Sequence, residues 1–451
     1  MTTPFTARLT ELIAAAPLHS PDSLPYVRPA FEDTLAVVFA GWGEPVTRRV
    51  AELYPGGAEM RPDGSYTVHP EAAALLLGTA AHALDYDDVQ LTSCTHPSAP
   101  IVAALLGAVQ SEPELAPRTT TAYGVGLAAN VGLGRVLGFS HYEKGWHATS
   151  TIGPLAAAAA VAYLYGLGPA DAGHALALAA AQAGGLQRNF GAMAKPLQAG
   201  LAGCAGLRAA QLARCGLTAD ADVFGAKGYF DLYGGAERGE DPDDVEFAID
   251  AGEISVKLYP CCYQTHRPIA VALQAREHLH REGIALERIA AIDVVAPPGS
   301  YLPLRVEDPR IGSEGKFCGA YTVACALIDG IVGLSHFEDE SVRRPEVRAL
   351  MERIRMIERE GKPDGLLRRG SPVELVARDA NGGLLVHTQV LAYPGSPDNP
   401  PTAAQREAKV RDCLAYYERR TGNGIDYENF QAFVAGLLSP ARRMPRAAAG
   451  D

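Results

Sequence analysis

The stretch GWHATSTIGPLAAAAAVAYLYGLGPA, residues 145–170, decides how the first half of the chain folds. From residue 152 onward it has no charged side chain and is long enough to be considered as a membrane span. Glycine and proline interrupt it at Gly153, Pro154, Gly166, Gly168 and Pro169. Alanine, not leucine, is its main residue. The stretch therefore predicts a helix in close contact with other helices inside a globular domain.

Segments of the same kind continue on both sides of this stretch. PEAAALLLGTAAHAL, PSAPIVAALLGAVQ and PADAGHALALAAAQA each begin with a proline, which is tolerated in the first turn of a helix. After His266 the pattern changes to a helix at 269–280, a β-like run ERIAAIDVVAP and a second helix around 321–327. Two alternating segments, PVELVARD and LLVHTQVLAYPG, follow, joined by a hairpin-type Asn-Gly-Gly turn.

This pattern predicts a mainly α protein with two domains. Residues 1–266 together with 401–451 are expected to form a large all-helical domain, and residues 267–400 a smaller α+β domain. The last residues, PARRMPRAAAGD, are expected to fray.

Charge and cysteine content limit the classes of binding partner that can be expected. The 451 residues carry a net charge of −12 without a dense basic tract, so neither nucleic acid nor a membrane is an expected partner. The eight cysteines show no CxxC spacing, which argues against a zinc ribbon or a disulfide framework. Arg8 and Glu11 interrupt the N-terminal apolar run, so no signal peptide is predicted. We expect a cytoplasmic protein with reduced thiols.

Five polar residues stand inside otherwise apolar motifs, spread over more than 200 residues. They are His96 in CTHPSAP, His147 in GWHATSTIGP, Lys195 in GAMAKPLQAG, Lys257 in VKLYPCCYQTH and Tyr321 in FCGAYTVACALIDG. Bases and cations in apolar surroundings can converge on one pocket, where they take a proton from carbon and hold an anionic substrate. For each residue alone, a structural role, or for a lysine a surface position, is the competing interpretation.

Further polar residues lie close to these motifs. Arg188 precedes Lys195 by seven residues, and His266 and Arg267 follow Lys257 near the predicted domain boundary, where pockets often form. We predict that Arg188, His266, Arg267 and Lys257 bind substrate.

The motif DYDD, Asp85–Asp88, places three carboxylates close together. A magnesium site would need a second acidic motif on a facing helix, and none has convincing spacing, so no metal is predicted. Helix capping with ion pairing, and a pocket role in which Asp85 orients a catalytic group, both remain open.

Together, the blocks HALDYDDVQLTSCTHPSAP, GWHATSTIGPLAAAAA, NFGAMAKPLQAG, KLYPCCYQTH and AYTVACALIDG resemble the MmgE/PrpD family, in the family's order. The resemblance implies a large helical domain built from both ends of the chain, a smaller lid domain, a homodimer, and no metal or organic cofactor. The pocket residues of the family's decarboxylases correspond to Asp85, His96, His147, Lys195, Lys257 and Tyr321. This chain departs from those decarboxylases at Val89, where they have threonine, and at Cys262, where they have histidine.

These observations predict a cofactor-independent lyase, a dehydratase or decarboxylase, that acts on a small di- or tricarboxylate by proton transfer next to a carboxylate. His96 and His147 are assigned to proton transfer, because an imidazole pKa lies near the operating pH. Lys195 and Lys257 are assigned to carboxylate binding and charge stabilisation. The alternative is an epimerase of an amino- or iminodicarboxylate. A non-catalytic binding protein and a metal-dependent enzyme using DYDD are weaker alternatives.

Overall fold

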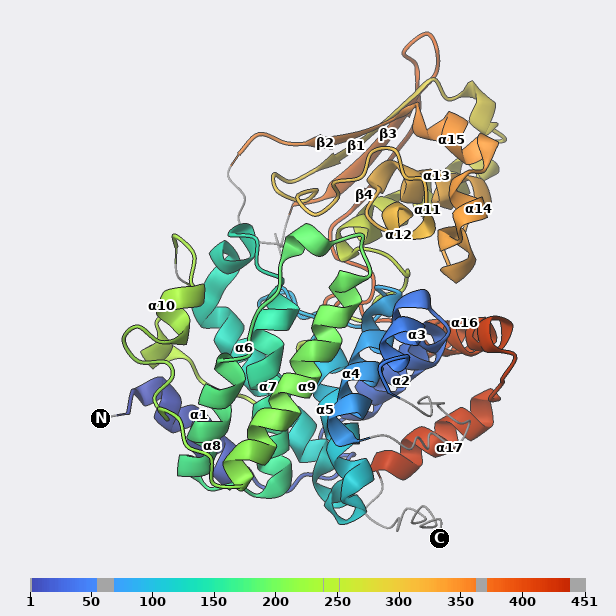
Figure 1. Cartoon of the computed structure of the whole chain (residues 1–451). Coiled ribbons are helices and arrows are strands. Elements are labelled where there is room, and N and C mark those ends of the chain that lie inside the picture. Colours follow the sequence, from blue (N-terminus) through green and yellow to red (C-terminus); the bar gives the residue numbers. More distant parts are fainter. Residues whose placement is uncertain (1, 55–68, 238, 251, 362–370, 439–451) are drawn as a thin grey trace. The chain divides into compact units, whose positions relative to one another are not determined.

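The computed structural model describes residues 2–54, 69–237, 239–250, 252–361 and 371–438. The chain divides into two compact units (Figure 1). The first consists of residues 1–83, 92–253 and 413–451, and the second of residues 84–91 and 254–412. The mainly α fold class is confirmed. The units differ from the predicted domains in that residues 84–91, 254–266 and 401–412 belong to the second one. The predicted frayed tail, residues 440–451, lies outside the described residues.

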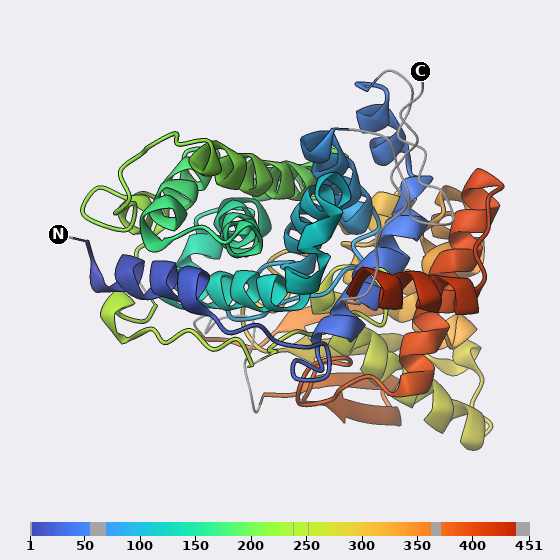
Figure 2. The same ribbon diagram turned by 90° about the horizontal axis from the view of Figure 1, so that it is seen from below.

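The first unit is a helical bundle (Figures 1 and 2). Helices α4 and α7 each pack against both α5 and α9. The helices of this unit are α1 (Pro4–Ala15), α2 (Val27–Trp42), α3 (Pro45–Ala51), α4 (Pro70–Ala83), α5 (Ser98–Ser111), α6 (Thr119–Glu143), α7 (Ala148–Tyr165), α8 (Pro169–Ala180), α9 (Ala194–Arg214), α10 (Tyr229–Tyr233) and α17 (Tyr427–Leu438). Helix α16 (Ala403–Thr421) contains the boundary between the units, after Asp412.

The central helix α7 is long and apolar enough to cross a membrane, but 94% of it is buried inside the structure. The predicted interior helix is therefore present. It begins at Ala148, so that Pro154 lies inside it. A proline cannot donate to the carbonyl four residues earlier, here that of Ser150. The backbone N–H of Gly184 donates to this carbonyl instead, at 3.1 Å, which ties the loop after α8 to the first turn of α7.

Small residues let the backbones of α4 and α9 come into direct contact. A Cβ on Gly200 would overlap the carbonyl oxygen of Leu75 and the hydroxyl of Thr79, and Gly78 on α4 faces Gly200 directly.

We therefore expect Gly200→Ala to lower the free energy of unfolding by about 1–3 kcal/mol or to force the two helices apart, because the overlapping atoms belong partly to backbone. Urea denaturation monitored by circular dichroism would measure this. Gly184→Ala is the matched control: its added Cβ would meet no atom within 4 Å, so its expected change is within about 0.5 kcal/mol. Equal losses in the two variants would contradict the steric explanation.

The second unit combines a four-stranded sheet with helices. Its strands are β1 (Ala291–Ala296), β2 (Ile354–Glu358), β3 (Val373–Arg378) and β4 (Leu384–Val390), in the order β2-β1-β3-β4. β1 pairs parallel with β2 and antiparallel with β3, and β3 and β4 form the predicted hairpin. The main helices are α11 (His266–Arg281), α13 (Gly319–Asp329) and α15 (Pro345–Met351), with the short α12 (Gly312–Gly315) and α14 (Asp339–Val342) between them.

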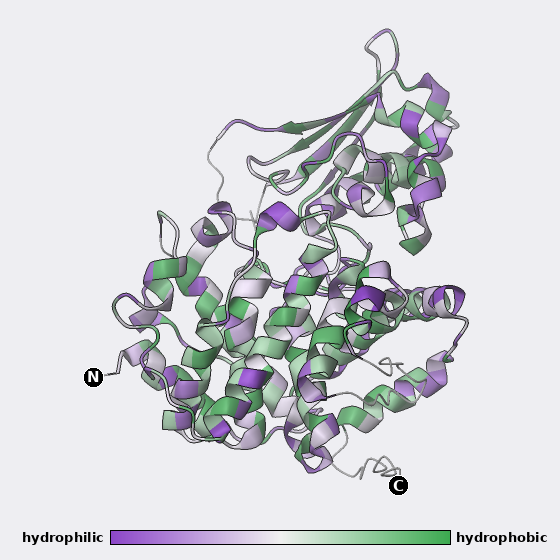
Figure 3. Cartoon of the chain, viewed as in Figure 1, coloured by the Kyte–Doolittle hydropathy of each residue, from purple (hydrophilic) through white to green (hydrophobic). Residues whose placement is uncertain are grey.

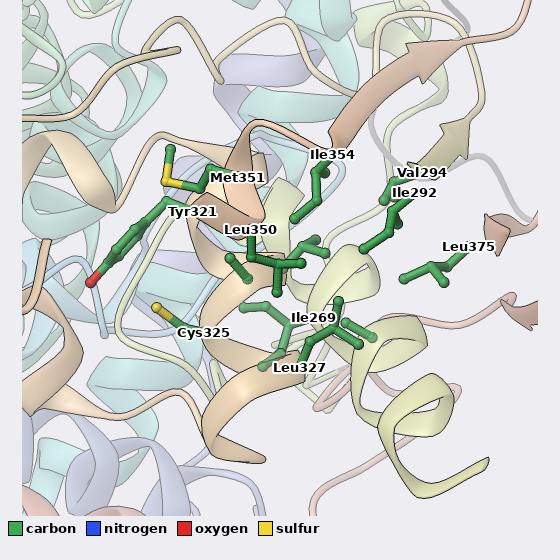
Figure 4. Close-up of a cluster of buried hydrophobic side chains, with 14 of the residues drawn as sticks. Ile269, Ile292, Val294, Tyr321, Cys325, Leu327, Leu350, Met351, Ile354 and Leu375 are labelled. Atoms are coloured by element: carbon green, nitrogen blue, oxygen red, sulfur yellow. The ribbon is translucent and has the colours of Figure 1, made fainter. Parts of the chain in front are cut away.

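Helices α11, α13 and α15 bury an aliphatic core against the sheet (Figure 4). Ile269 on α11, Leu350 on α15 and Leu375 on β3 are among its members. In Figure 3 the strands carry stretches of the hydrophobic colour, interrupted at polar residues. Tyr321, on α13, lies at the border of this core, with its hydroxyl pointing away from the aliphatic side chains.

Candidate active site

His147 occupies the N-cap position of α7 and is 2% exposed. Its Nδ1 lies 2.7 Å from Oε1 of Gln198 on α9. Because an amide oxygen only accepts hydrogen bonds, Nδ1 carries the hydrogen and Nε2 carries the lone pair. This Nε2 is buried and has no hydrogen-bond partner among the described residues. Burial, followed by the nearby charges of His82 and Lys195, holds the pKa of His147 well below its usual value.

His96 lies in the turn before α5 and is half-buried. Its backbone N–H donates to the hydroxyl of Thr149, in the first turn of α7, at 3.0 Å. The preceding residues are fixed by Asn130 on α6, whose Nδ2 donates to Ser93 and to Thr95, both at 2.9 Å. This buried network holds the turn in one conformation, and with it the position of His96.

Lys195 lies in the first turn of α9 and is 5% exposed. Its Nζ lies 5.3 Å from the centre of the Phe190 ring, and the His147 ring packs edge-on against the same phenylalanine at 5.2 Å. A lysine and two histidines thus stand at the beginnings of α5, α7 and α9. The N-terminus of a helix is its positive end, so the cluster is suited to a negatively charged ligand.

A third imidazole belongs to this cluster and was not predicted. His82, in the last turn of α4, is 1% exposed. Its ring packs against that of His96 with centres 4.5 Å apart and stacks on that of His147 at 5.6 Å. It stands in the apolar segment LLLGTAAHAL directly before DYDD. The criterion that selected His96, a polar residue inside an apolar motif, would also have selected it.

In the second unit, Lys257 and Asp85 form a buried ion pair. The side chain of Lys257 is 1% exposed, and its Nζ lies 2.9 Å from both Oδ1 and the backbone oxygen of Asp85. Burial alone would lower the pKa of Lys257, but the carboxylates of Asp85 and Asp87 outweigh it and raise this pKa. Asp85 has a left-handed backbone conformation, with φ of 53°, which aspartate tolerates better than most residues.

Two more buried lysines, also not predicted, bind the same segment. Lys316 Nζ donates to the carbonyls of Leu84 and Pro260, and Lys409 Nζ donates to that of Tyr86 at 2.8 Å. Three successive carbonyls, of residues 84, 85 and 86, therefore each accept from a lysine. The DYDD segment is thus an ion-paired part of the second unit, in agreement with the structural alternative left open for it.

The other predicted residues are placed as follows. His266 is fully buried in the second unit between Tyr259 and Tyr263, and burial followed by the charge of Lys257 keeps its pKa well below the usual value. The buried guanidinium of Arg267 donates to the carbonyls of Ser371 and Leu391 and to the Tyr393 hydroxyl, and the Tyr321 hydroxyl donates to the His336 carbonyl. Arg188, on the 3-10 turn Gln187–Asn189 of the first unit, is exposed.

The structure therefore brings together His96, His147 and Lys195 in the first unit, and Asp85, Lys257 and His266 in the second. Arg267 and Tyr321 donate to backbone carbonyls and to tyrosine within the second unit. Convergence of all these residues on one pocket, and their roles toward a substrate, stay predictions.

The chain belongs to the MmgE/PrpD family: the family's N-terminal domain matches residues 7–240 and its C-terminal domain matches residues 259–424. This confirms the resemblance seen in the sequence motifs.

Three relatives carry names that refer to one lyase activity. Cis-aconitate decarboxylase of Mus musculus is 28% identical over 72% of this chain and 69% of its own length. The Homo sapiens enzyme of the same name is 30% identical over 66% of this chain and 63% of its own length. A cis-aconitate decarboxylase-like protein of Aspergillus oryzae is 26% identical over 88% of this chain and 85% of its own. These names support an enzyme of the lyase class with a carboxylate substrate.

Proposed function

We propose that this protein is a cofactor-independent lyase that acts on a small di- or tricarboxylate, with cis-aconitate and related tricarboxylates as the first substrates to test. The observation that carries the proposal is the state of His147. Its Nδ1 is held by Gln198, and its Nε2 carries a buried lone pair without a hydrogen-bond partner among the described residues. An imidazole in this state at neutral pH is a general base.

The surroundings of His147 fit an anionic substrate. Lys195 contributes a positive charge, and the beginnings of α5, α7 and α9 contribute the positive ends of three helices. In buried surroundings these charges act more strongly than they would in water. They would bind a carboxylate and stabilise the additional negative charge that develops when a neighbouring carbon becomes a carbanion.

The proposed chemistry is proton transfer between His147 Nε2 and the carbon next to a substrate carboxylate. In a dehydration, Nε2 takes the carbon-bound proton and the hydroxyl on the neighbouring carbon leaves with its electron pair. In a decarboxylation, the carboxylate leaves as CO₂, its bonding electrons stay on carbon, and a protonated imidazole supplies the proton that replaces it. Both reactions would use an imidazole for proton transfer and the same cationic surroundings for the carboxylates.

The test is proton NMR in D₂O with purified protein and a panel of 2-methylcitrate, citrate, cis-aconitate, malate and iminodisuccinate. We expect one substrate to lose CO₂ or water, with deuterium appearing only at carbons next to a carboxylate. His147→Gln is the matched inactive variant. Deuterium at an α-carbon without loss of any group would identify an epimerase instead, and no reaction or exchange on any compound would contradict both assignments.

The homodimer, the cytoplasmic location and the absence of a cofactor remain predictions that rest on the family resemblance and on composition. The predicted substrate-binding roles of Lys257, Arg188, His266 and Arg267 likewise await measurement. Among them, Arg188 is the one that lies exposed in the first unit.

A further inference from the structure

We propose that His82 is a further member of the acid–base set of the first unit, and that it takes up the first proton that the imidazole cluster binds and thereby keeps His147 neutral. This inference deepens the proposed function, since it rests on the use of His147 as a base. His82 acts through His147, so it is a positioning residue and not one that must touch the substrate.

The first argument is proximity. The ring centre of His82 lies 4.5 Å from that of His96 and 5.6 Å from that of His147, and His82 is 1% exposed. Two imidazolium charges at such distances in buried surroundings repel each other strongly. The three rings therefore titrate as a coupled group, in which one proton discourages the next.

The second argument decides which ring takes that proton. His82 stands in the last turn of α4, at the negative end of the helix, which favours a positive charge. His147 stands at the N-cap of α7 and His96 directly before the N-cap of α5, each at the positive end of a helix, which disfavours a positive charge. The hydrogen bond from Nδ1 of His147 to Gln198 fixes its neutral tautomer but offers its Nε2 no acceptor.

The third argument concerns other charges on the helices of the first unit that pack against α4 and α7. α9, which packs against both α4 and α7, contributes Lys195, which further opposes a proton on His147. α6 presents His141 to α7, but both of its ring nitrogens are hydrogen-bonded, to Tyr233 and Thr151, and burial lowers its pKa to about 4. α5, which packs against both α4 and α7, carries no charged side chain. α2, which packs against α4, has one buried carboxylate, Asp33.

The causes of the lowered pKa of His147 agree with these arguments. Burial comes first, and the charge of His82 is the next largest cause, ahead of Lys195 and His96. Removing the ionisable ring of His82 would therefore make His147 easier to protonate.

The experiment is a pH titration of the protein with ¹⁵N-labelled histidine between pH 5 and 8, followed by ring-nitrogen NMR without substrate. Signals are assigned with His82→Gln and His147→Gln. We expect His82 to protonate first as the pH falls while His147 keeps its Nδ1–H tautomer. In His82→Gln the protonation of His147 should move to higher pH by about one unit, and His141 should stay neutral as the internal reference.

Protonation of His147 before His82, or an unchanged His147 titration in His82→Gln, would overturn the proposal. Should His82→Gln fail to fold, His82→Phe keeps a flat ring in place, and the order of titration in the unmodified protein still decides. Because no substrate is present, these results do not depend on the proposed function. With a substrate identified, the acidic limb of kcat/KM should shift to higher pH in the same variant, whereas a merely structural role for His82 would leave its position unchanged.

Discussion

Replacement of His147 by glutamine is expected to lower kcat by about 10²–10⁴-fold, the usual contribution of a general base. Glutamine can keep a hydrogen bond to Gln198, but it offers no basic nitrogen at the position of Nε2. Because the binding groups around Lys195 stay in place, the affinity for a carboxylate ligand should change much less than kcat does. The measurement is steady-state kinetics together with calorimetric binding of a substrate analogue.

The pH dependence provides a second criterion for the same variant. His147 works as a base when it is neutral, and burial with the charges of His82 and Lys195 lowers its pKa. For a dehydration, in which neutral Nε2 takes the proton, activity should therefore persist below pH 6.5 and be lost only as the pH falls through this lowered pKa. The residual activity of His147→Gln should lack that limb.

His174→Gln is the matched control for the loss of an imidazole. His174 is half-buried on α8, and its Nδ1 accepts from the backbone N–H of Ala219. The activity of His174→Gln should equal that of the unmodified protein. A His147→Gln protein with kcat within tenfold of the unmodified protein would remove His147 from the role of base.

The sequence predicted α4, α5 and α8 because their apolar segments are long and a proline stands at or directly before the beginning of each. Strand β2 was missed. Its segment, with the sequence IRMIE, mixes charged and apolar residues without a regular alternation, and only Ile354 in it is buried, as at the edge of a sheet. The pair Gly153-Pro154 resembles the beginning of a helix, yet α7 begins earlier, at Ala148. Pro154 can lie inside the helix because the carbonyl to which it cannot donate, that of Ser150, accepts from Gly184 instead.

The candidate site was predicted through residues that stand out from their neighbours. His96, His147 and Lys195 do so, and the structure places them in one unit. Lys409 does not, because it lies in AAQREAKVRD, a segment patterned like a solvent-exposed helix, although it is 4% exposed. The segment 84–91 could not be assigned to the second unit from the sequence, since that depends on Lys257, Lys316 and Lys409, which are far away in the chain.

The largest expected effect on stability comes from separating Lys257 and Asp85. Lys257→Met removes the positive charge and leaves a carboxylate in a buried position, so we expect the free energy of unfolding of the second unit to fall by about 3–5 kcal/mol. The measurement is urea denaturation, followed by a probe placed in the second unit. Arg355→Met is the matched control, because the ion pair between Arg355 and Asp293 also lies in this unit, with the arginine side chain 67% exposed. Its loss should be far smaller.

The double variant separates charge burial from loss of packing. Asp85→Asn is the appropriate partner change, because asparagine also tolerates the left-handed backbone conformation with φ of 53° that this position requires. Once both charges are removed, no uncompensated charge stays buried, so Lys257→Met with Asp85→Asn should be more stable than Lys257→Met alone. The interaction free energy from the double-mutant cycle would then be clearly different from zero. If the two single losses simply add, the two side chains are not coupled, and the stability of the segment would have to come from Lys316 and Lys409, whose bonds to the carbonyls of Leu84 and Tyr86 stay intact in all three variants.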